Sequence, residues 1–250
     1  MSTAYSFIDI QVAPKSLPVA KGFRFTDREL DILEFILEMK FSTLEDIHSK
    51  FFKVTKDGSI SNSLIWARQR ISKLIKSDYV QTLTDVCAKP LYVLTQKGFL
   101  FLKNSRLSKR FCRPLLEVDA RFFDHDQRVA QARIELEKSG VVKSWISERQ
   151  LSEFEEFKKY LSAEFRPDGI YETFDGKKVA FELEIARKSK DRYQQKVKRY
   201  ISLITDGGHD PIFSQVHFVC EKENIQKLIQ DYTELFQPYF KFNLISEIIK

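Results

Sequence analysis

Apolar residues recur every three or four positions in the early part of the chain, and this spacing predicts a series of helices. A first helix is predicted over residues 27–40, where Thr26 and Glu29 have the spacing of a capping box. A second, shorter helix is predicted over residues 42–52, where Ser42 has a glutamate three residues later. Both segments therefore begin with a side chain that can cap a helix.

A third helix is predicted to run from Ser61 or Asn62 to residue 76, and its two faces differ in chemistry. The face expected to be buried holds Leu64, Ile65, Ala67, Ile71, Leu74 and Ile75. The opposite face presents Asn62, Ser63, Arg68, Arg70 and Lys73. A helix that reads DNA buries one face and offers such polar and basic side chains to bases and phosphates. The same pattern also fits a solvated basic face on a helical module that binds proteins.

The pattern changes after the third helix, where residues 79–94 predict two strands joined by a turn. A further helix is predicted over residues 95–104, with Thr95 as its cap. Three helices followed by a strand pair is the element order of a winged helix-turn-helix, and the segment resembles many bacterial winged-helix regulators. We therefore expect an N-terminal arm over residues 1–24 and a winged helix-turn-helix domain over residues 25–105.

The second half, residues 116–250, alternates between predicted helices and strands. Helices are expected over residues 122–138, 189–204 and 223–236, and strands over residues 141–151, 169–174, 177–185 and 214–220. Asp175 and Gly176 predict a tight turn between two of these strands. Alternate strand residues share a face, so Glu182 and Glu184 point one way and their apolar neighbours point into a core. The expected fold class is α+β or α/β.

Acidic residues on two neighbouring strands resemble the motif of the PD-(D/E)XK nuclease superfamily. Asp168 follows Pro167 near one strand, and Glu182 lies on the predicted partner strand, which precedes a helix. The resemblance implies a restriction-endonuclease-like domain in which Asp168 and Glu182 hold Mg²⁺. That ion binds oxygen ligands and lowers the pKa of a bound water.

The last position of this motif departs from the usual pattern. Glu184 stands where the superfamily usually has lysine, and it would act as a third metal ligand or as a base. Lys188, just past the strand, or Lys196, on the following helix, would supply the missing positive charge. The alternative is that Glu182 and Glu184 form the solvated face of an edge strand.

Several motifs in residues 25–205 together resemble the replication-relaxation family. They are the winged helix, Asp124-His125, Arg166-Pro167-Asp168, Glu182 with Glu184, and a lysine-rich helix with Lys196, Arg199 and Tyr200. Members of that family are associated with plasmid replication and with relaxation of plasmid DNA at transfer origins. The resemblance makes His125 an accessory residue of the site, although a histidine at a helix start also serves as a structural cap.

Charge is distributed unevenly along the chain. Residues 1–120 hold 19 basic and 13 acidic residues, whereas residues 121–250 hold 22 of each. The net charge of +6 therefore lies in the first half and indicates a domain that faces a polyanion. A basic linker over residues 106–115 adds Lys109 and Arg110, which either contact phosphates or are solvated. The neutral second half argues against a nuclease that grips DNA by itself.

Cysteine, histidine and hydropathy patterns indicate which disulfides, metal sites and membrane segments to expect. Three separated cysteines form no CxxC pair, and the four histidines lack metal-ligand spacing, so neither a disulfide framework nor a zinc site is expected. No signal peptide is recognisable, and no apolar run approaches the roughly 18 residues of a membrane span. We expect a protein of the bacterial cytoplasm.

Three functional hypotheses follow. The first is a non-catalytic protein of a mobile element that binds duplex DNA, either a plasmid replication or mobilisation accessory or a transcriptional regulator, whose second half forms a homodimer or holds DNA. The second is a Mg²⁺-dependent endonuclease that uses Asp168, Glu182, Glu184 and Lys188. The third is an adaptor for a relaxase or replication initiator. We favour the first, with DNA contacts expected from Asn62, Ser63, Arg68, Arg70, Lys73, Lys109, Arg110 and Lys196.

Overall fold

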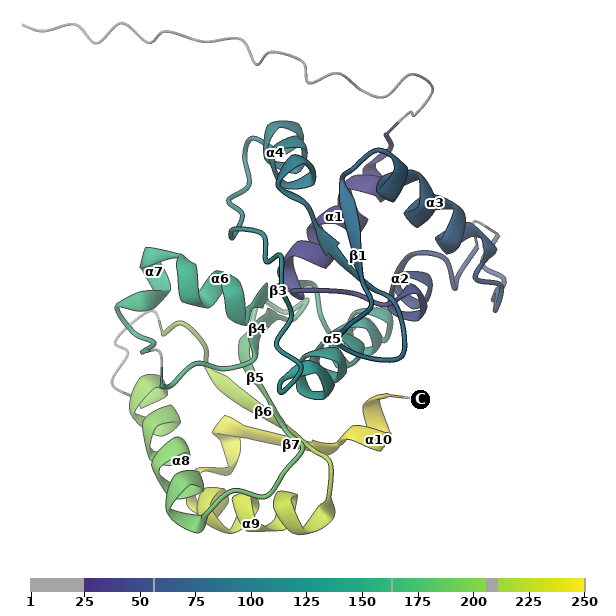
Figure 1. Ribbon diagram of the computed structural model, residues 1–250. Coiled ribbons are helices and arrows are strands. Elements are labelled where there is room, and N and C mark those ends of the chain that lie inside the picture. The colour runs from purple at the N-terminus through teal and green to yellow at the C-terminus, as the bar shows by residue number, and fades with distance from the viewer. Residues whose placement is uncertain (1–24, 56, 163, 206–210, 250) are drawn as a thin grey trace, which may run out of the picture.

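A group of helices followed by a two-stranded hairpin forms the N-terminal half, in the order that the hydrophobic spacing predicts (Figure 1). The computed structural model describes residues 25–55, 57–162, 164–205 and 211–249, so the predicted arm lies outside the described residues. The elements of this half are α1 (Asp27–Glu38), α2 (Leu44–Phe51), α3 (Ile65–Lys76), β1 (Val80–Leu83), β2 (Leu91–Leu94) and α4 (Gln96–Ser105). Strands β1 and β2 pair antiparallel, and α4 begins at the predicted Thr95 cap.

The start of α2 differs from the prediction, because Thr43 rather than Ser42 caps the helix. The Thr43 hydroxyl accepts a hydrogen bond from the backbone N–H of Asp46 at 3.2 Å and donates one to its carboxylate at 2.7 Å. Ser42 instead exchanges two backbone hydrogen bonds with Tyr92 of β2, at 3.0 and 2.9 Å. The predicted pairing of Ser42 with Glu45 is therefore wrong, since the backbone of Ser42 extends the hairpin.

Helix α3 is shorter than predicted and buries a narrower face than expected. It begins at Ile65, so Asn62 and Ser63 precede it. Ala67, Ile71 and Leu74 are its buried residues, at the spacing of one helical face. Two residues expected to be buried are exposed instead: Ile65 by 55% and Ile75 by 36%.

A mixed five-stranded sheet dominates the second half of the described chain. Its order is β3 (Ser144–Ser147), β4 (Gly169–Glu172), β5 (Lys178–Glu184), β6 (Gln215–Cys220) and β7 (Phe240–Leu244). Strands β3, β4 and β5 pair antiparallel, whereas β6 and β7 run parallel to β5. The predicted α+β class is confirmed. Strand β5 is the central strand, so the alternative that placed Glu182 and Glu184 on a solvated edge strand is wrong.

The remaining elements include some that the sequence did not predict. They are α5 (Phe123–Lys138), α6 (Glu148–Glu153), α7 (Glu155–Lys158), α8 (Lys190–Thr205), α9 (Glu223–Thr233), the 3₁₀ helix η1 (Glu234–Tyr239) and α10 (Ile245–Ile248). Ser147 caps α6, which occupies the end of the strand expected over 141–151. Strand β7 and helix α10 were not predicted, and α9 ends before the predicted residue 236. Among the described residues, none of these helices is long and apolar enough to cross a membrane.

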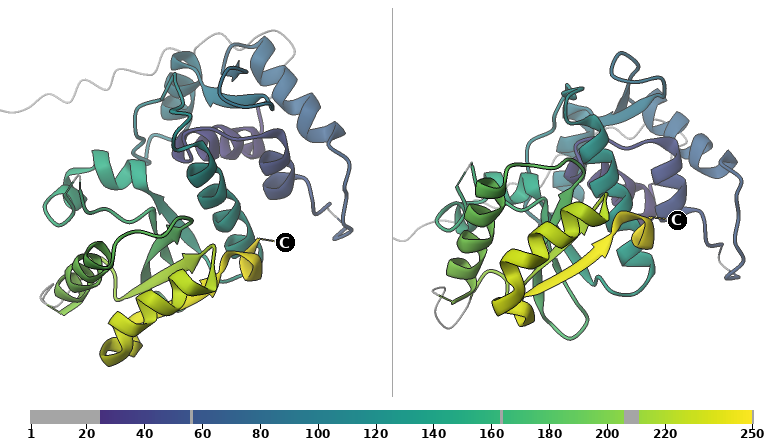
Figure 2. Two further views of the ribbon diagram at one scale, coloured as in Figure 1. Left: turned by 60° about the horizontal axis from the view of Figure 1, so that its bottom comes forward. Right: turned by 90° about the horizontal axis from the view of Figure 1, so that it is seen from below.

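Helices cover both faces of the sheet (Figure 2). Residues of α8 and α9 pack with Ile170, Ala180 and Phe218 in one core on the first face. Helix α5 packs with Tyr171 and Phe181 on the other face. Because alternate residues of β4 and β5 serve opposite cores, Glu182 and Glu184 face α8, as the alternation predicts.

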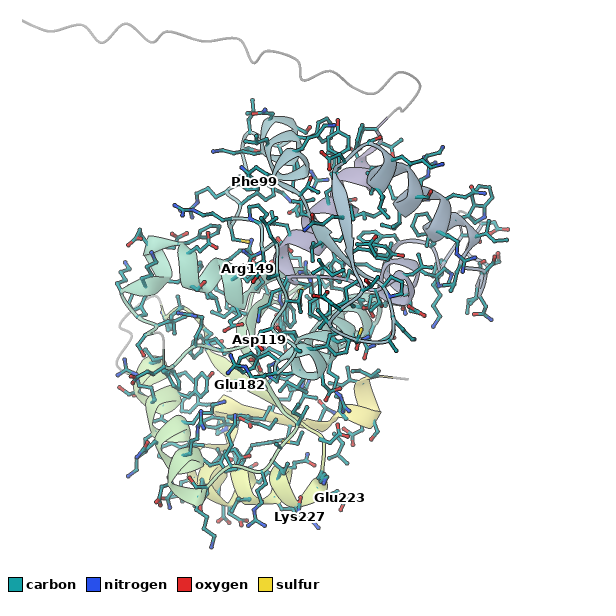
Figure 3. The ribbon with its side chains drawn as sticks, in the orientation of Figure 1. Phe99, Asp119, Arg149, Glu182, Glu223 and Lys227 are labelled. Carbon is teal, nitrogen blue, oxygen red and sulfur yellow. The ribbon has the colours of Figure 1, made fainter. Side chains whose placement is uncertain are left out.

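The two halves share an interface built around α1 and α5. Phe35 of α1 and its C-cap residue Met39 belong to the same hydrophobic core as α5 and strands β3 to β5. The guanidinium of Arg149, a residue of α6 that Figure 3 labels, donates a 2.7 Å hydrogen bond to the backbone carbonyl of Leu37 in α1. Buried apolar surface therefore joins the N-terminal half, called here the helix–hairpin half (α1 to α4 with the β1–β2 hairpin), to the sheet.

The basic segment predicted as a linker is bound to the rest of the protein. Its Cys112 is buried in the N-terminal core. Lys109 lies 2.6 Å from Glu34, and Arg110 forms an ion pair with Glu156. These two cations are therefore paired with carboxylates of the chain itself, and the structure does not bring them to the exposed face of α3.

Candidate functional site

Two of the predicted acidic residues converge because β4 and β5 pair antiparallel. Gly169 lies opposite Phe181 in this register, which places Asp168 beside Glu182 at the end of the strand pair. A carboxylate oxygen of Asp168 accepts a 2.7 Å hydrogen bond from the backbone N–H of Leu183. Asp168 and Glu182 both line a cleft of about 550 Å³ between the sheet and α8, where Figure 3 labels Glu182.

Helix α8 places a lysine and a tyrosine against these strand residues. Lys196 Nζ lies 2.7 Å from Glu182 Oε2 and 2.8 Å from Glu184 Oε1. One helical turn later, the hydroxyl of Tyr200 donates a hydrogen bond to Glu182 Oε1. Burial raises the pKa of Glu182 to about 7, and Lys196 opposes that rise. Burial lowers the pKa of Lys196, but Glu182 and Glu184 outweigh it and raise that pKa above its ordinary value.

Glu184 lies behind this arrangement. Its side chain is 0% exposed and contacts two ammonium groups, those of Lys196 and Lys188, the latter at 2.8 Å. Lys188 lines the cleft, whereas Glu184 does not. The structure thus brings Asp168, Glu182 and Lys188 to the cleft and keeps Glu184 beneath the two lysines.

The donor set fits one kind of metal site. In the described part of the chain, no three or more His, Cys, Asp or Glu side chains are arranged to hold a metal ion among themselves. Mg²⁺, however, commonly binds through one or two carboxylates together with substrate phosphates and water. Asp168 and Glu182 line the cleft and match that two-carboxylate requirement, whereas Glu184, predicted as a third ligand, does not line it.

His125 joins the cleft from the first turn of α5. Its Nε2 lies 3.4 Å from Asp168 Oδ2, and its Nδ1 lies 3.6 Å from Asp126 Oδ1. Burial lowers the pKa of His125, but the two carboxylates outweigh burial and raise it to about 10. Burial also raises the pKa of Asp168, yet His125 brings it below its ordinary value. His125 is therefore an imidazolium paired with Asp168 at neutral pH.

The cleft is basic although the second half of the chain has no net charge. Besides His125, it is lined by the basic residues Arg166, Lys188, Arg192, Lys196 and Arg199. Its acidic lining residues are Glu164, Asp168 and Glu182. The residues of α8 share one helical face, which gathers cations that a net count averages away. The zero net charge of residues 121–250, which argued against a nuclease that grips DNA, therefore does not describe the local charge of the cleft.

Helix α3 presents a second polar surface, at the opposite end of the molecule from α9 (Figure 1). Arg68 and Lys73 are exposed, as are Asn62 and Ser63 before the helix. Arg70 is half-buried instead, and it lies 3.2 Å from the buried carboxylate of Glu29. The structure therefore supports four of the five predicted positions as surface residues and assigns Arg70 to a structural ion pair.

Other residues on this surface were missed. Opposite the buried face of α3 lies a stripe of one residue per turn, made of Ile65, Gln69, Ser72 and Lys76. Trp66, which is 60% exposed, flanks this stripe. The helical spacing of the buried residues Ala67, Ile71 and Leu74 could have identified this stripe. The apolar residues Ile65 and Ile75 obscured that spacing, because both are exposed.

The fold and cleft define a mixed α+β protein that carries an exposed basic helix at one end and a carboxylate–lysine cleft on its sheet. A family model described as Replication-relaxation matches residues 33–216, and the chain belongs to this family. The match spans α1 to the start of β6 and so includes both surfaces. Comparison with curated proteins and with solved structures finds no match. Membership suggests a role in the replication or relaxation of plasmids or other mobile elements.

Proposed function

We propose that the protein is a DNA-binding accessory of plasmid replication or mobilisation, which meets duplex DNA through α3 and the β1–β2 hairpin as a winged helix. The observation that carries the proposal is the outward face of α3, where Arg68, Gln69 and Lys73 are exposed on a helix whose other face is buried. Arginine and glutamine are side chains that read base edges in the major groove, and lysine neutralises phosphates.

The second half supports this function as a nuclease-like domain that holds the DNA backbone. The strand with Asp168 at its start pairs with the strand that carries Glu182, and α8 follows, as the nuclease motif predicts. Arg166, Arg192 and Arg199 line the same cleft, and their charges favour a phosphodiester.

A second candidate function is Mg²⁺-dependent cleavage of DNA. This function is favoured by the position of Lys196. The nuclease motif usually has a lysine at position 184, where this chain has glutamate, and Lys196 places an ammonium group beside Glu182 instead. Asp168 and Glu182 would hold the ion, which when bound acidifies a water and offsets charge on the phosphate. Lys196, fixed by two carboxylates, would stabilise the charge that develops on the phosphate oxygens, while Lys188 holds Glu184 in place.

One experiment separates these functions. Purified protein is incubated with supercoiled plasmid in Mg²⁺, Mn²⁺ or EDTA, and the same samples are assayed by gel shift. The variants are Asp168→Asn for the cleft and a double substitution of Arg68 and Lys73 by alanine for α3. We expect a salt-sensitive shift that the α3 variant weakens. Nicking that needs metal and is lost in Asp168→Asn would establish the endonuclease. The absence of a shift at low salt would refute DNA binding and favour an adaptor for a protein partner such as a relaxase.

A further inference from the structure

The backbone at Lys40 has a conformation that lysine rarely adopts. Helix α1 ends with Met39 as its C-cap, and Lys40 follows with a φ of 73°. This left-handed position after a helix is commonly glycine, because any side chain strains the backbone there. A glycine at position 40 would end the helix with less strain, so the lysine side chain itself needs an explanation.

The ammonium of Lys40 crosses from the N-terminal half to α5. It lies 2.8 and 2.9 Å from the two carboxylate oxygens of Asp126, and 3.0 Å from Glu148 of α6. Three quarters of the Lys40 side chain is removed from solvent. An ammonium shared between two carboxylates at this depth is held more firmly than a surface ion pair.

The contacts continue from Asp126 into the cleft. Asp126 lies beside the Nδ1 edge of His125, and the Nε2 edge of the same ring faces Asp168. Lys40, Asp126, His125 and Asp168 therefore form a continuous line of polar contacts that ends on a carboxylate of the cleft. A line of this kind orients its inner members, because Asp126 and His125 each lie between two polar partners.

We propose that Lys40 is a positioning residue for the cleft: it fixes Asp126, which orients His125, which in turn holds the Asp168 carboxylate toward the cleft. This proposal rests on the proposed function, in which the cleft holds the DNA backbone. Lys40 itself does not line the cleft that contains Glu182 and Lys196. The helix–hairpin half thereby contributes a residue on which the geometry of the cleft depends.

The test compares three substitutions at position 40 in the full chain. Lys40→Arg keeps a cation that can reach Asp126. Lys40→Met and Lys40→Gly both remove the charge, but only glycine relieves the backbone, so we expect Lys40→Gly to melt at a higher temperature than Lys40→Met. If Lys40 served only the stability of the fold, these substitutions would change the melting temperature and leave the geometry of the cleft unchanged.

Two measurements report on the geometry of the cleft rather than on the stability of the protein. The first is the downfield N–H proton resonance of the His125 ring, assigned by its loss in His125→Gln. The second is the affinity for Mn²⁺, measured by calorimetry with Asp168→Asn as control. We expect the methionine and glycine variants to lose the resonance and to bind Mn²⁺ about 10-fold more weakly, whereas Lys40→Arg keeps both.

The outcomes are distinguishable. An unchanged His125 resonance in Lys40→Met and Lys40→Gly would overturn the proposal, as would a glycine variant that keeps the wild-type resonance and Mn²⁺ affinity. If wild-type protein binds no Mn²⁺ while the resonance still depends on a cation at position 40, the metal site fails and the positioning role stands.

Discussion

The ammonium of Lys196 lies 2.7 Å from the carboxylate of Glu182, although the two residues are 14 positions apart and belong to different elements. Glu182 points from the central strand toward α8, and Lys196 points back from the middle of that helix. Both side chains are largely buried, so each offsets the cost of removing the other from water. The pair is therefore both the chemical centre of the cleft and a structural link between β5 and α8.

Removal of Lys196 is expected to destabilise the fold strongly. Lys196→Met leaves Glu182 and Glu184 buried without their shared cation, which corresponds to a loss of about 3–5 kcal/mol. Urea unfolding followed by circular dichroism measures this change. Lys198→Met is the matched control, because Lys198 is an exposed residue of the same helix and should change stability by less than about 0.5 kcal/mol. Equal effects of the two substitutions would contradict the buried pair.

Acid should destabilise the protein through His217. Its ring lies between the Tyr171 hydroxyl and Asn243, at 3.1 and 3.0 Å, and burial lowers its pKa to about 3. Between about pH 6.5 and pH 3 the unfolded chain binds the proton and the folded one does not, so stability falls as pH falls. The contribution of this residue is up to about 1.4 kcal/mol per pH unit.

The His217 contribution can be isolated by substitution. His217→Gln keeps hydrogen-bonding groups at this position but cannot titrate, so its free energy of unfolding should depend less steeply on pH between 6.5 and 4 than that of the wild type. Parallel pH profiles for the two proteins would show that the ring is protonated in the folded state.

The basic residues of α3 should separate into two classes. Arg68→Ala and Lys73→Ala are each expected to weaken duplex binding and to lower the slope of log K against log salt by about 1. Arg70→Ala should leave that slope unchanged and instead cost about 2 kcal/mol of stability, because the buried carboxylate of Glu29 loses its cation and keeps only its hydrogen bonds from Thr26. Fluorescence anisotropy across a salt series, with thermal unfolding, measures both effects. A reduced salt slope for Arg70→Ala would instead show that Arg70 contacts DNA.

Gly169 should tolerate no side chain, because the indole of Trp145 covers it. A Cβ at this position would lie 2.5 Å from Cζ2 of Trp145. Gly169→Ala is therefore expected to cost about 1–3 kcal/mol and to displace the neighbouring Asp168 from the cleft. In a Trp145→Leu background the same substitution should cost less, since the smaller side chain leaves room. Additive effects of the two substitutions would exclude the contact as the cause.

Local patterns in the sequence predicted most of the elements and one feature of the site. The cap at Thr95, the turn at Asp175 and Gly176, and the shared face of Glu182 and Glu184 all appear in the structure. Each depends on residues within a few positions of one another, and backbone periodicity expresses such relations directly. Asp168 and Glu182 could also be paired from sequence, because a tight turn fixes the register of the two strands.

Tertiary structure decided the relations between elements. The sequence could not show that β5 is central, that Lys196 bridges Glu182 and Glu184, or that Lys109 and Arg70 are bound to carboxylates of the chain itself. It also could not show that Lys40, which follows α1, reaches Asp126 of α5, 86 positions away. Hydrophobic spacing specifies which face of each element is buried, but which charges meet across two packed elements depends on strand order and helix rotation. Those follow from the packing of the whole chain.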